Sequence, residues 1–201
     1  MKMIVTNDTQ HGSEPPSAWV QRWSHLVAPG GGVLDVACGY GRHARWFYER
    51  NHPVALVDRA QAAINSIASI IPAHACEAVV ADIENGPWPF VGRQFAAVVV
   101  TNYLWRPLFP SLLGSLQPGG VLIYETFTQG NGTVGKPSRP DFLLRTGELL
   151  DVCKALRVVA FEDGFQQAAD GSAPRFVQRI AAVRAADAGE TVDQPARYTL
   201  P

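Results

Sequence analysis

The stretch VLDVACGYGRHARWF, from Val33 to Phe47, decides the fold of this chain. A short apolar run that carries Asp35 breaks at the sequence CGYG, and a helix-like segment follows. This pattern predicts a strand, a tight glycine turn and a helix N-terminus. In an open parallel sheet, such a turn lies at the carboxyl end of a strand, where ligands bind. Gly39 and Gly41 allow unusual backbone angles and a close approach by a ligand.

The composition indicates one globular domain. The chain has 201 residues, of which 47% are hydrophobic and 17% are charged, and its formal net charge is -1. It contains no Lys/Arg-rich run of the kind that follows phosphates, which argues against a nucleic-acid partner. No segment approaches the roughly 20 apolar residues of a spanning helix, and the N-terminus resembles no signal peptide, so no membrane partner is expected.

Three isolated cysteines, Cys38, Cys76 and Cys153, show neither a CxxC pair nor a Cys/His ligand spacing. We therefore expect neither a disulfide framework nor a metal site. These features together are typical of a reduced, soluble, cytoplasmic protein. We interpret Cys38 as a small packed residue and not as a nucleophile.

Strands and helices alternate along most of the chain. We expect a flexible N-terminus at 1–14, one domain at 15–184 and a loose C-terminal tail at 185–201. The expected strands are 33–37, 54–57, 77–81, 95–100, 121–125, 157–162 and 175–183. The expected helices are 15–27, 42–51, 61–71, 107–116 and 146–155. The connection 128–140 is long, which is typical of a functional loop.

This alternation predicts an α/β fold with a parallel sheet and right-handed crossovers. The run 95–100 is almost continuously apolar, as expected of a central strand that is buried on both faces. The last two strands have no helix between them. The link from Asp163 to Pro174 is long enough for an antiparallel pair at one edge of the sheet.

The glycine turn alone leaves the cofactor open. The segment GYGRHA, from Gly39 to Ala44, satisfies the loose dinucleotide pattern G-x-G-x-x-G/A, and Asp58 follows about 20 residues after the turn. This pattern suits a nicotinamide cofactor as well as an adenosyl ligand. Asp35 within the first strand needs a polar partner, Asp82 at the end of the third strand can accept from an adenine amino group, and a helix precedes the first strand. These three features favour the adenosyl ligand.

The motifs of this chain, in their order along the sequence, resemble those of class I S-adenosylmethionine-dependent methyltransferases. The motifs are DVACGYG at 35–41, Asp58, Asp82, TNY at 101–103 and LQPGG at 116–120. The resemblance covers about 15–184, and within the family the chain is similar to small stand-alone members of the tellurite-resistance-like group. It implies a doubly wound, Rossmann-like, mostly parallel seven-stranded sheet of order 3-2-1-4-5-7-6 with the seventh strand antiparallel. The implied cofactor is S-adenosyl-L-methionine, with S-adenosyl-L-homocysteine as the product.

The resemblance also implies which residues bind the cofactor. Asp58 would take the ribose hydroxyls, Asp82 and the backbone of Ile83 would read adenine, and Trp88 or Phe90 would cover its ring. Arg22, on the first helix, would pair with the methionine carboxylate. The full implied set is Arg22, Asp35, Ala37, Gly39, Gly41, Asp58, Arg59, Asp82, Ile83, Asn102 and Tyr103.

Methyl transfer by in-line displacement depends mainly on positioning, which can contribute roughly 7–11 kcal/mol. The lack of an obvious catalytic dyad is therefore compatible with an enzyme. Candidates for contacts with the acceptor are Tyr40, Tyr103, Arg106, Glu125 and the loop 128–140 with Asn131 and Lys136. The sequence NYLW at 102–105 lacks both prolines of the signature that amino-nitrogen methyltransferases carry there. We expect a small-molecule acceptor.

Less specific interpretations remain open. His43 follows the turn and is a candidate base, although a surface histidine is the more ordinary interpretation. Asp82 at a strand end is often only a turn residue. For the whole chain, the alternatives are a non-catalytic adenosylmethionine-binding module and an NAD-dependent oxidoreductase.

Overall fold

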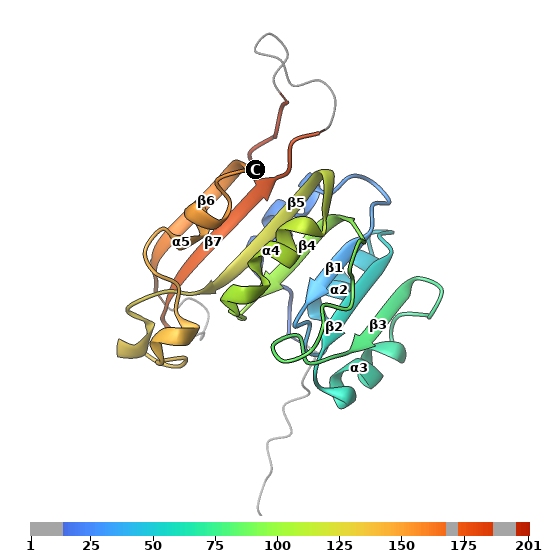
Figure 1. Cartoon of the computed structure of the whole chain (residues 1–201), viewed down its shortest axis with the longest axis horizontal. Coiled ribbons are helices and arrows are strands. Elements are labelled where there is room, and N and C mark those ends of the chain that lie inside the picture. The colour runs from blue at the N-terminus through green and yellow to red at the C-terminus, as the bar shows by residue number, and fades with distance from the viewer. Residues whose placement is uncertain (1–13, 168–172, 187–195) are drawn as a thin grey trace, which may run out of the picture.

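Parallel strand pairing brings the ends of the central strands to one edge of a single sheet. The computed structural model describes residues 14–167, 173–186 and 196–201, and its strands lie in the order β3-β2-β1-β4-β5-β7-β6 (Figure 1). The pairs β1–β2, β1–β4, β2–β3 and β4–β5 are parallel, whereas β7 is antiparallel to β5 and β6. The predicted strand order and the antiparallel seventh strand are confirmed. The strands are β1 (Val33–Val36), β2 (Val54–Asp58), β3 (Cys76–Val80), β4 (Phe95–Thr101), β5 (Leu116–Phe127), β6 (Arg157–Gln166) and β7 (Arg175–Val183).

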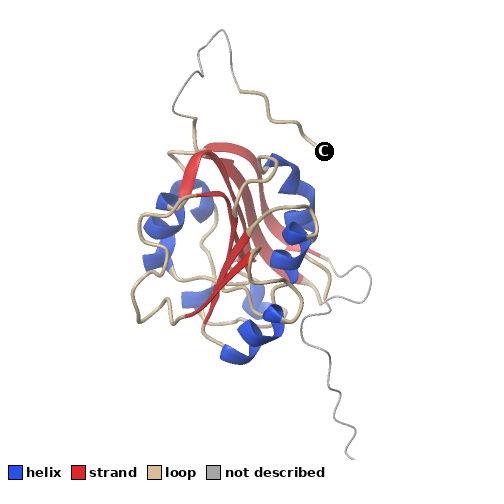
Figure 2. Ribbon diagram, turned by 90° about the vertical axis from the view of Figure 1, so that its right-hand side faces the viewer, coloured by secondary structure: helices blue, strands red, loops and turns tan. Residues whose placement is uncertain are grey.

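Helices cover both faces of the sheet, as Figure 2 shows. One core packs α1, α2 and α3 against the sheet through Trp23, Phe47 and Ile67. The other core packs α4 and α5 against the opposite face through Leu112 and Leu149. The helices are α1 (Ala18–Trp23), α2 (Arg42–Tyr48), α3 (Gln61–Ala68), α4 (Phe109–Gly114) and α5 (Glu148–Val152), with short 3₁₀ turns at Ser24–Leu26, Arg106–Leu108, Asn131–Thr133 and Pro140–Phe142.

The central strands are apolar because both of their faces are buried. In β4, Val99 belongs to the core under α1 to α3, and its neighbours Val98 and Val100 belong to the other core. Successive side chains of a strand point to opposite faces, so a strand at the centre of such a sheet needs an unbroken apolar run. The run 95–100 was predicted to be such a strand, and this prediction is confirmed.

The segment between β4 and β5 differs from the prediction. The expected helix 107–116 is a 3₁₀ turn followed by the short helix α4, and β5 begins at Leu116 instead of 121. The pairing of β5 with β4 shifts register between Phe95 and Ala97. The sequence PGG at 118–120 therefore forms an irregular part of β5 instead of a loop before it. A Cβ on Gly120 would lie 2.8 Å from the carbonyl oxygen of Phe95, which explains why glycine is required here.

The N-terminal helix lies against the sheet and is shorter than predicted. Ser17 caps α1, and the indole N–H of Trp19 donates to the carbonyl of Ile180 in β7 at 3.2 Å. Of the expected flexible N-terminus, all but Glu14 lies outside the described residues. Part of the expected tail is described, and there the carbonyl of Thr199 lies 2.9 Å from Nε2 of His25.

The turn between β1 and α2 is built from left-handed backbone. Ala37, Gly39 and Gly41 have φ angles of +52°, +52° and +72°. Gly41 is buried, and a Cβ added to it would lie 2.7 Å from Cγ1 of Ile67 in α3. The missing side chain at this position therefore allows α3 to pack directly against the turn.

We expect Gly41→Ala to destabilise the protein by about 2–5 kcal/mol, because it combines left-handed strain with overpacking against Ile67. Gly30→Ala is the matched control, since Gly30 has a similar φ of +69° but open space around the position of a Cβ. The control should cost only about 1–2 kcal/mol. Urea denaturation of both variants measures the difference. Equal losses would show that the contact with Ile67 contributes nothing.

Candidate functional site

Two adjoining cavities lie at the carboxyl ends of β1, β2 and β4. The first has a volume of about 290 Å³ and the second of about 200 Å³. Ala37 and Tyr103 line both, so the two cavities are neighbours that share a wall. The first cavity is lined by Glu14, Ala37, Cys38, Gly39, Tyr40, Arg42, His43, Thr101, Asn102 and Tyr103. The second is lined by Ala37, Asp58, Arg59, Ala81, Asp82, Ile83, Glu84 and Tyr103.

Two residues at the strand ends hold strained backbone beside these cavities. Ala37 follows β1 and Asn102 follows β4, and each has a positive φ, +52° and +54°. For residues other than glycine, this conformation costs of order 1–3 kcal/mol and persists only where its surroundings enforce it. The two strands are neighbours in the sheet. Two of the three residues other than glycine that have a positive φ in the described part of the chain thus line the first cavity, and the third, Asn51, does not.

Asp58 joins the end of β2 to the glycine turn. Its Oδ2 accepts from the backbone N–H of Gly39 at 2.8 Å, and its Oδ1 accepts from the N–H of Ala60 at 2.9 Å. The side chain is partly exposed and lines the second cavity. Asp58 thus braces the turn while it remains accessible to a ligand.

Asp82 follows β3, also lines the second cavity and begins a turn. Its carboxylate accepts from the N–H groups of Glu84 and Asn85 at 3.0 and 3.2 Å and from the side-chain amide of Asn85 at 2.9 Å. These hydrogen bonds, that of the side-chain amide above all, lower the pKa of Asp82. Both the turn and the ligand interpretations of this residue are compatible with its position.

Asp35 lies beneath the turn and is absent from the residues that line the cavities. It is 2% exposed, and its Oδ2 accepts from the N–H of Ala44 in α2 at 3.1 Å. Burial raises its pKa to about 7, although the Ala44 hydrogen bond and the charge of Arg42 oppose the shift. The hydrogen bond between Asp35 and the Ala44 amide orients α2 relative to β1.

His43 is a buried residue, so its interpretation as a surface histidine is wrong. It is 2% exposed, and its Nε2 accepts from the backbone N–H of Ser17 at 3.2 Å. Burial, together with the neighbouring charge of Arg42, lowers its pKa to about 3. The ring is neutral at pH 7, and the N-terminal segment that covers it is 26 residues away in sequence.

Cys38 is also buried beside the first cavity. Burial and the nearby Asp35 raise the pKa of its thiol, so the sulfur remains protonated and its interpretation as a packed residue agrees with the structure. Tyr40 is 38% exposed and lines the same cavity. Tyr103 lies between the cavities, where burial and the carboxylate of Glu84 raise the pKa of its phenol.

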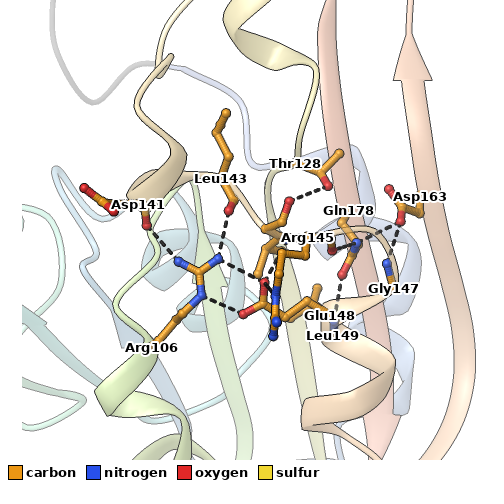
Figure 3. A network of polar contacts seen from close by, with 11 residues as sticks. Arg106, Thr128, Asp141, Leu143, Arg145, Gly147, Glu148, Leu149, Asp163 and Gln178 are labelled. Atoms are coloured by element: carbon orange, nitrogen blue, oxygen red, sulfur yellow. Dashed lines mark hydrogen bonds and ion pairs between the residues drawn. The ribbon is translucent and has the colours of Figure 1, made fainter.

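Arg106 is occupied by a polar network away from the cavities (Figure 3). Its guanidinium donates to both carboxylate oxygens of Glu148, at 2.7 and 2.9 Å, and to the carbonyls of Asp141 and Leu143, at 2.9 and 2.8 Å. Hydrogen bonds from Arg106 and from the backbone of Arg145 hold the pKa of Glu148 below its ordinary value, although burial alone would raise it. Arg106 therefore ties the segment after β4 to the start of α5, and its prediction as an acceptor contact is not supported.

Glu125 is likewise occupied by protein partners. It is 2% exposed, lies 2.6 Å from Nε of Arg179 and 3.7 Å from Arg175, and accepts from Oγ of Ser17 at 3.0 Å. Arg22 pairs with Glu162 at 3.5 Å and is not among the residues that line either cavity. Of the predicted site residues, Glu125 and Arg22 are therefore not brought together with Asp58 and Asn102.

The loop 128–140 is absent from the lining of both cavities. Asn131 is buried, donates to the carbonyl of Pro137 at 3.0 Å and accepts from the N–H of Phe176 at 3.1 Å, so it folds the loop onto β7. The expected adenine covers, Trp88 and Phe90, pack on each other at 5.5 Å between ring centroids. They too lie outside the residues that line the cavities.

Several residues that line the cavities were not predicted as site residues, and three of them, Arg42, Glu84 and Glu14, are charged. Arg42 directly follows the glycine turn and Glu84 directly follows Ile83, so their proximity to the motifs was the available signal. Glu14 has no such signal, because only the packing of α1 brings it to the site. Among the described residues, no helix is long and apolar enough to cross a membrane, and no cluster of His, Cys, Asp and Glu has the arrangement of a metal site.

Comparisons with known proteins find similarity in one part of the sequence and in the fold. Residues 33–120 match a family model described as a methyltransferase domain. No curated protein matches the sequence. Solved structures with similar folds include TehB from Haemophilus influenzae, with a TM-score of 0.64 and 17% identity over 80% of this chain and 59% of that chain.

A S-adenosylmethionine-dependent methyltransferase from Mesorhizobium loti has a TM-score of 0.64 and 15% identity over 84% of this chain and 99% of that one. The glycopeptide N-methyltransferase MtfA, in complex with S-adenosyl-L-methionine, has a TM-score of 0.59 and 17% identity over 90% of this chain and 100% of that one. The [4+2]-cyclase SpnF, with a TM-score of 0.62 and 14% identity over 84% of this chain and 78% of that one, has the same fold. At these identities, the likeness concerns the fold alone.

The buried Asp35 should make stability depend on pH. The unfolded chain releases this proton near 3.8, whereas the folded protein holds it until about 7, so the stabilising effect of the proton is fully present below pH 4 and is lost as the pH rises to about 7. Each pKa unit corresponds to about 1.4 kcal/mol. We expect Asp35→Asn to gain stability relative to wild type as the pH rises from 4 to 8. Urea denaturation along this pH series would contradict the assignment if the difference between the two proteins stayed constant.

Removing Arg106 should destabilise the fold, because Glu148 would keep a largely buried carboxylate without its main partner. We expect Arg106→Gln to cost about 3 kcal/mol. Arg139→Gln is the control, since Arg139 and Asp141 form an exposed pair that should be worth less than about 1 kcal/mol. Thermal denaturation with calorimetry compares the two variants. Similar small losses would show that the network in Figure 3 does not stabilise the protein.

Proposed function

We propose that this chain is a class I S-adenosylmethionine-dependent methyltransferase that transfers a methyl group from that cofactor to a small-molecule acceptor. The single observation that carries the proposal is the adjoining pair of cavities at the carboxyl ends of β1, β2 and β4, whose lining contains Gly39, Asp58, Asp82 and Asn102 of the methyltransferase motifs. In open α/β sheets, ligands bind at such strand ends.

The second cavity suits the adenosine part of the cofactor. Asp58 would accept hydrogen bonds from the ribose hydroxyls, and the Asp82 carboxylate with the backbone of Ile83 would read the adenine edge. Arg59 and Tyr103 would flank the ring. In support, the pKa of Asp82 is lowered, so its carboxylate is an acceptor at neutral pH, as an adenine amino group requires.

The first cavity suits the methionine part. Ala37, Gly39, Asn102 and Tyr103 would line it, with Gly41 and Asp35 shaping the turn from below. A Cβ on Gly39 would meet no atom within 4 Å, so the space over the turn is open to a ligand that approaches the backbone. The residues present therefore fit the cofactor that the family implies.

The bound cofactor supplies an electrophilic methyl group on a positively charged sulfonium. Since that charge is lost in the transition state, the protein needs no strong oxyanion hole, and alignment of the acceptor can contribute roughly 7–11 kcal/mol. His43 already accepts a hydrogen bond at Nε2, so we assign it no role as a general base. An acceptor atom that is ionised or soft would need no general base.

The acceptor would enter the part of the first cavity that Glu14, Tyr40 and Arg42 surround. This cavity, with a volume of about 290 Å³, would hold the acceptor together with the methionine part of the cofactor. A space of this size suits a small molecule. The fold does not determine the acceptor, since one similar structure is an N-methyltransferase of glycopeptides and another is a [4+2]-cyclase.

The unpaired cysteines support a reducing compartment such as the cytoplasm.

Calorimetric titration with S-adenosyl-L-methionine, S-adenosyl-L-homocysteine and NAD tests the cofactor. We expect the first two to bind at about micromolar Kd and NAD not to bind. Asp58→Ala should weaken binding by about 10–100-fold, since a hydrogen bond to a charged group is worth about 1.5–3 kcal/mol. Asp151→Ala, on the exposed side of α5, is the control and should leave the Kd unchanged.

Binding of NAD in place of the adenosyl ligands would overturn the proposal in favour of an oxidoreductase. A Kd that Asp58→Ala leaves unchanged would place the cofactor outside the second cavity. Adenosyl binding without methyl transfer to any member of a broad panel of thiols, phenols, amines and carboxylates would favour the non-catalytic binding module.

A further inference from the structure

Ser17 makes hydrogen bonds to two buried side chains that belong to different parts of the fold. Its Oγ donates to Oε1 of Glu125 at 3.0 Å, and its backbone N–H donates to Nε2 of His43 at 3.2 Å. The same Oγ accepts from the N–H of Trp19 at 3.1 Å and so caps α1. One residue thereby connects the N-terminal helix to the end of β5 and to α2.

Both anchors belong to the framework around the first cavity. His43 is 2% exposed and lines that cavity. Glu125 is also 2% exposed and is the register partner of Thr101, which lines the cavity from β4. Arg179 holds the Glu125 carboxylate at 2.6 Å, so the acceptor for the Ser17 hydroxyl is fixed in position.

The residues before Ser17 are held much more loosely. Glu14 lines the first cavity, yet its side chain is 71% exposed and lies 3.5 Å from the Arg42 guanidinium. The guanidinium also donates to the carbonyl of Pro15 at 3.4 Å. Such an exposed pair is worth at most about 1 kcal/mol. Contacts therefore weaken from Ser17 outward, and two consecutive prolines, Pro15 and Pro16, keep the short segment stiff.

We propose that Ser17 is a positioning residue that holds the segment 14–16 as a movable wall of the first cavity and thereby controls the entry and release of ligands there. The inner end of the wall is fixed through Glu125 and His43, and its outer end, at Glu14, opens by giving up the contact with Arg42. The identity of the ligand rests on the proposed function.

A purely structural role for Ser17 as the cap of α1 predicts different behaviour. Aspartate caps helices as well as serine does, but an aspartate at this position has no proton to donate and would repel Glu125. Ser17→Asp thus keeps the cap and breaks the link to β5. Ser17→Thr keeps both, because threonine retains the hydroxyl.

The test measures the dissociation rate of S-adenosyl-L-homocysteine by stopped flow and the exchange of the residue 17 amide hydrogen in the ligand-free protein by NMR. We expect Ser17→Asp to increase both rates about tenfold and Ser17→Thr to stay within about twofold of wild type. Ser66→Ala is the control, since the Ser66 hydroxyl donates to the carbonyl of Ala63 within α3, and the variant should change neither rate.

Unchanged dissociation in Ser17→Asp, with the product still bound by wild type, would overturn the positioning role and leave the proposed function intact. Faster amide exchange without faster dissociation would also overturn it, because the segment would then be loosened without affecting the ligand. Failure of wild type to bind the product would instead refute the proposed function, and the control of ligand release would fall with it.

Discussion

Two carboxylates hold the turn after β1, and the site depends on the shape of that turn. Asp35 accepts from the Ala44 amide in the first turn of α2, and Asp58 accepts from the Gly39 amide in the turn itself. One bond sets the direction in which α2 leaves the sheet, and the other joins β1 to the end of β2. The left-handed backbone at Ala37, which is strained for a residue with a side chain, is maintained by this surrounding structure.

The parallel sheet converts this local turn into a site. Because β1, β2 and β4 run in the same direction, their carboxyl ends bring the glycine turn, Asp58 and Asn102 to one edge. The loop after β3 adds Asp82 to the lining of the second cavity. The combination of a strained strand end, an accessible carboxylate and open space above a glycine is well suited to an extended ligand with both polar and apolar parts.

Polar side chains at the opposite half of the sheet serve the fold instead. Arg106 and Glu148 connect the segment after β4 to α5, and Glu125 with Arg179 connects β5 to β7 and to the N-terminal helix. Buried charges of this kind need partners, which accounts for their close ion pairs. Their role is to join the strands and helices of this half of the sheet. In the proposed function, the acceptor would instead contact the residues around Glu14, Tyr40 and Arg42.

The sequence by itself determined the glycine turn, the apolar central strand and the positions of Asp58, Asp82 and Asn102, because each depends on short-range patterns: apolar runs, glycine spacing and residues at strand ends. The strand order, which the structure confirms, was implied only by the resemblance to a known family, because strand pairing joins segments that are far apart in the sequence. Only the tertiary structure decided what happens to His43, Arg106 and Glu125. The hydrogen-bond partners of these side chains lie 26, 42 and 108 residues away. Burial and ion pairing depend on such distant partners, so a charged residue near a motif looks the same in sequence whether it binds a ligand or another part of the chain.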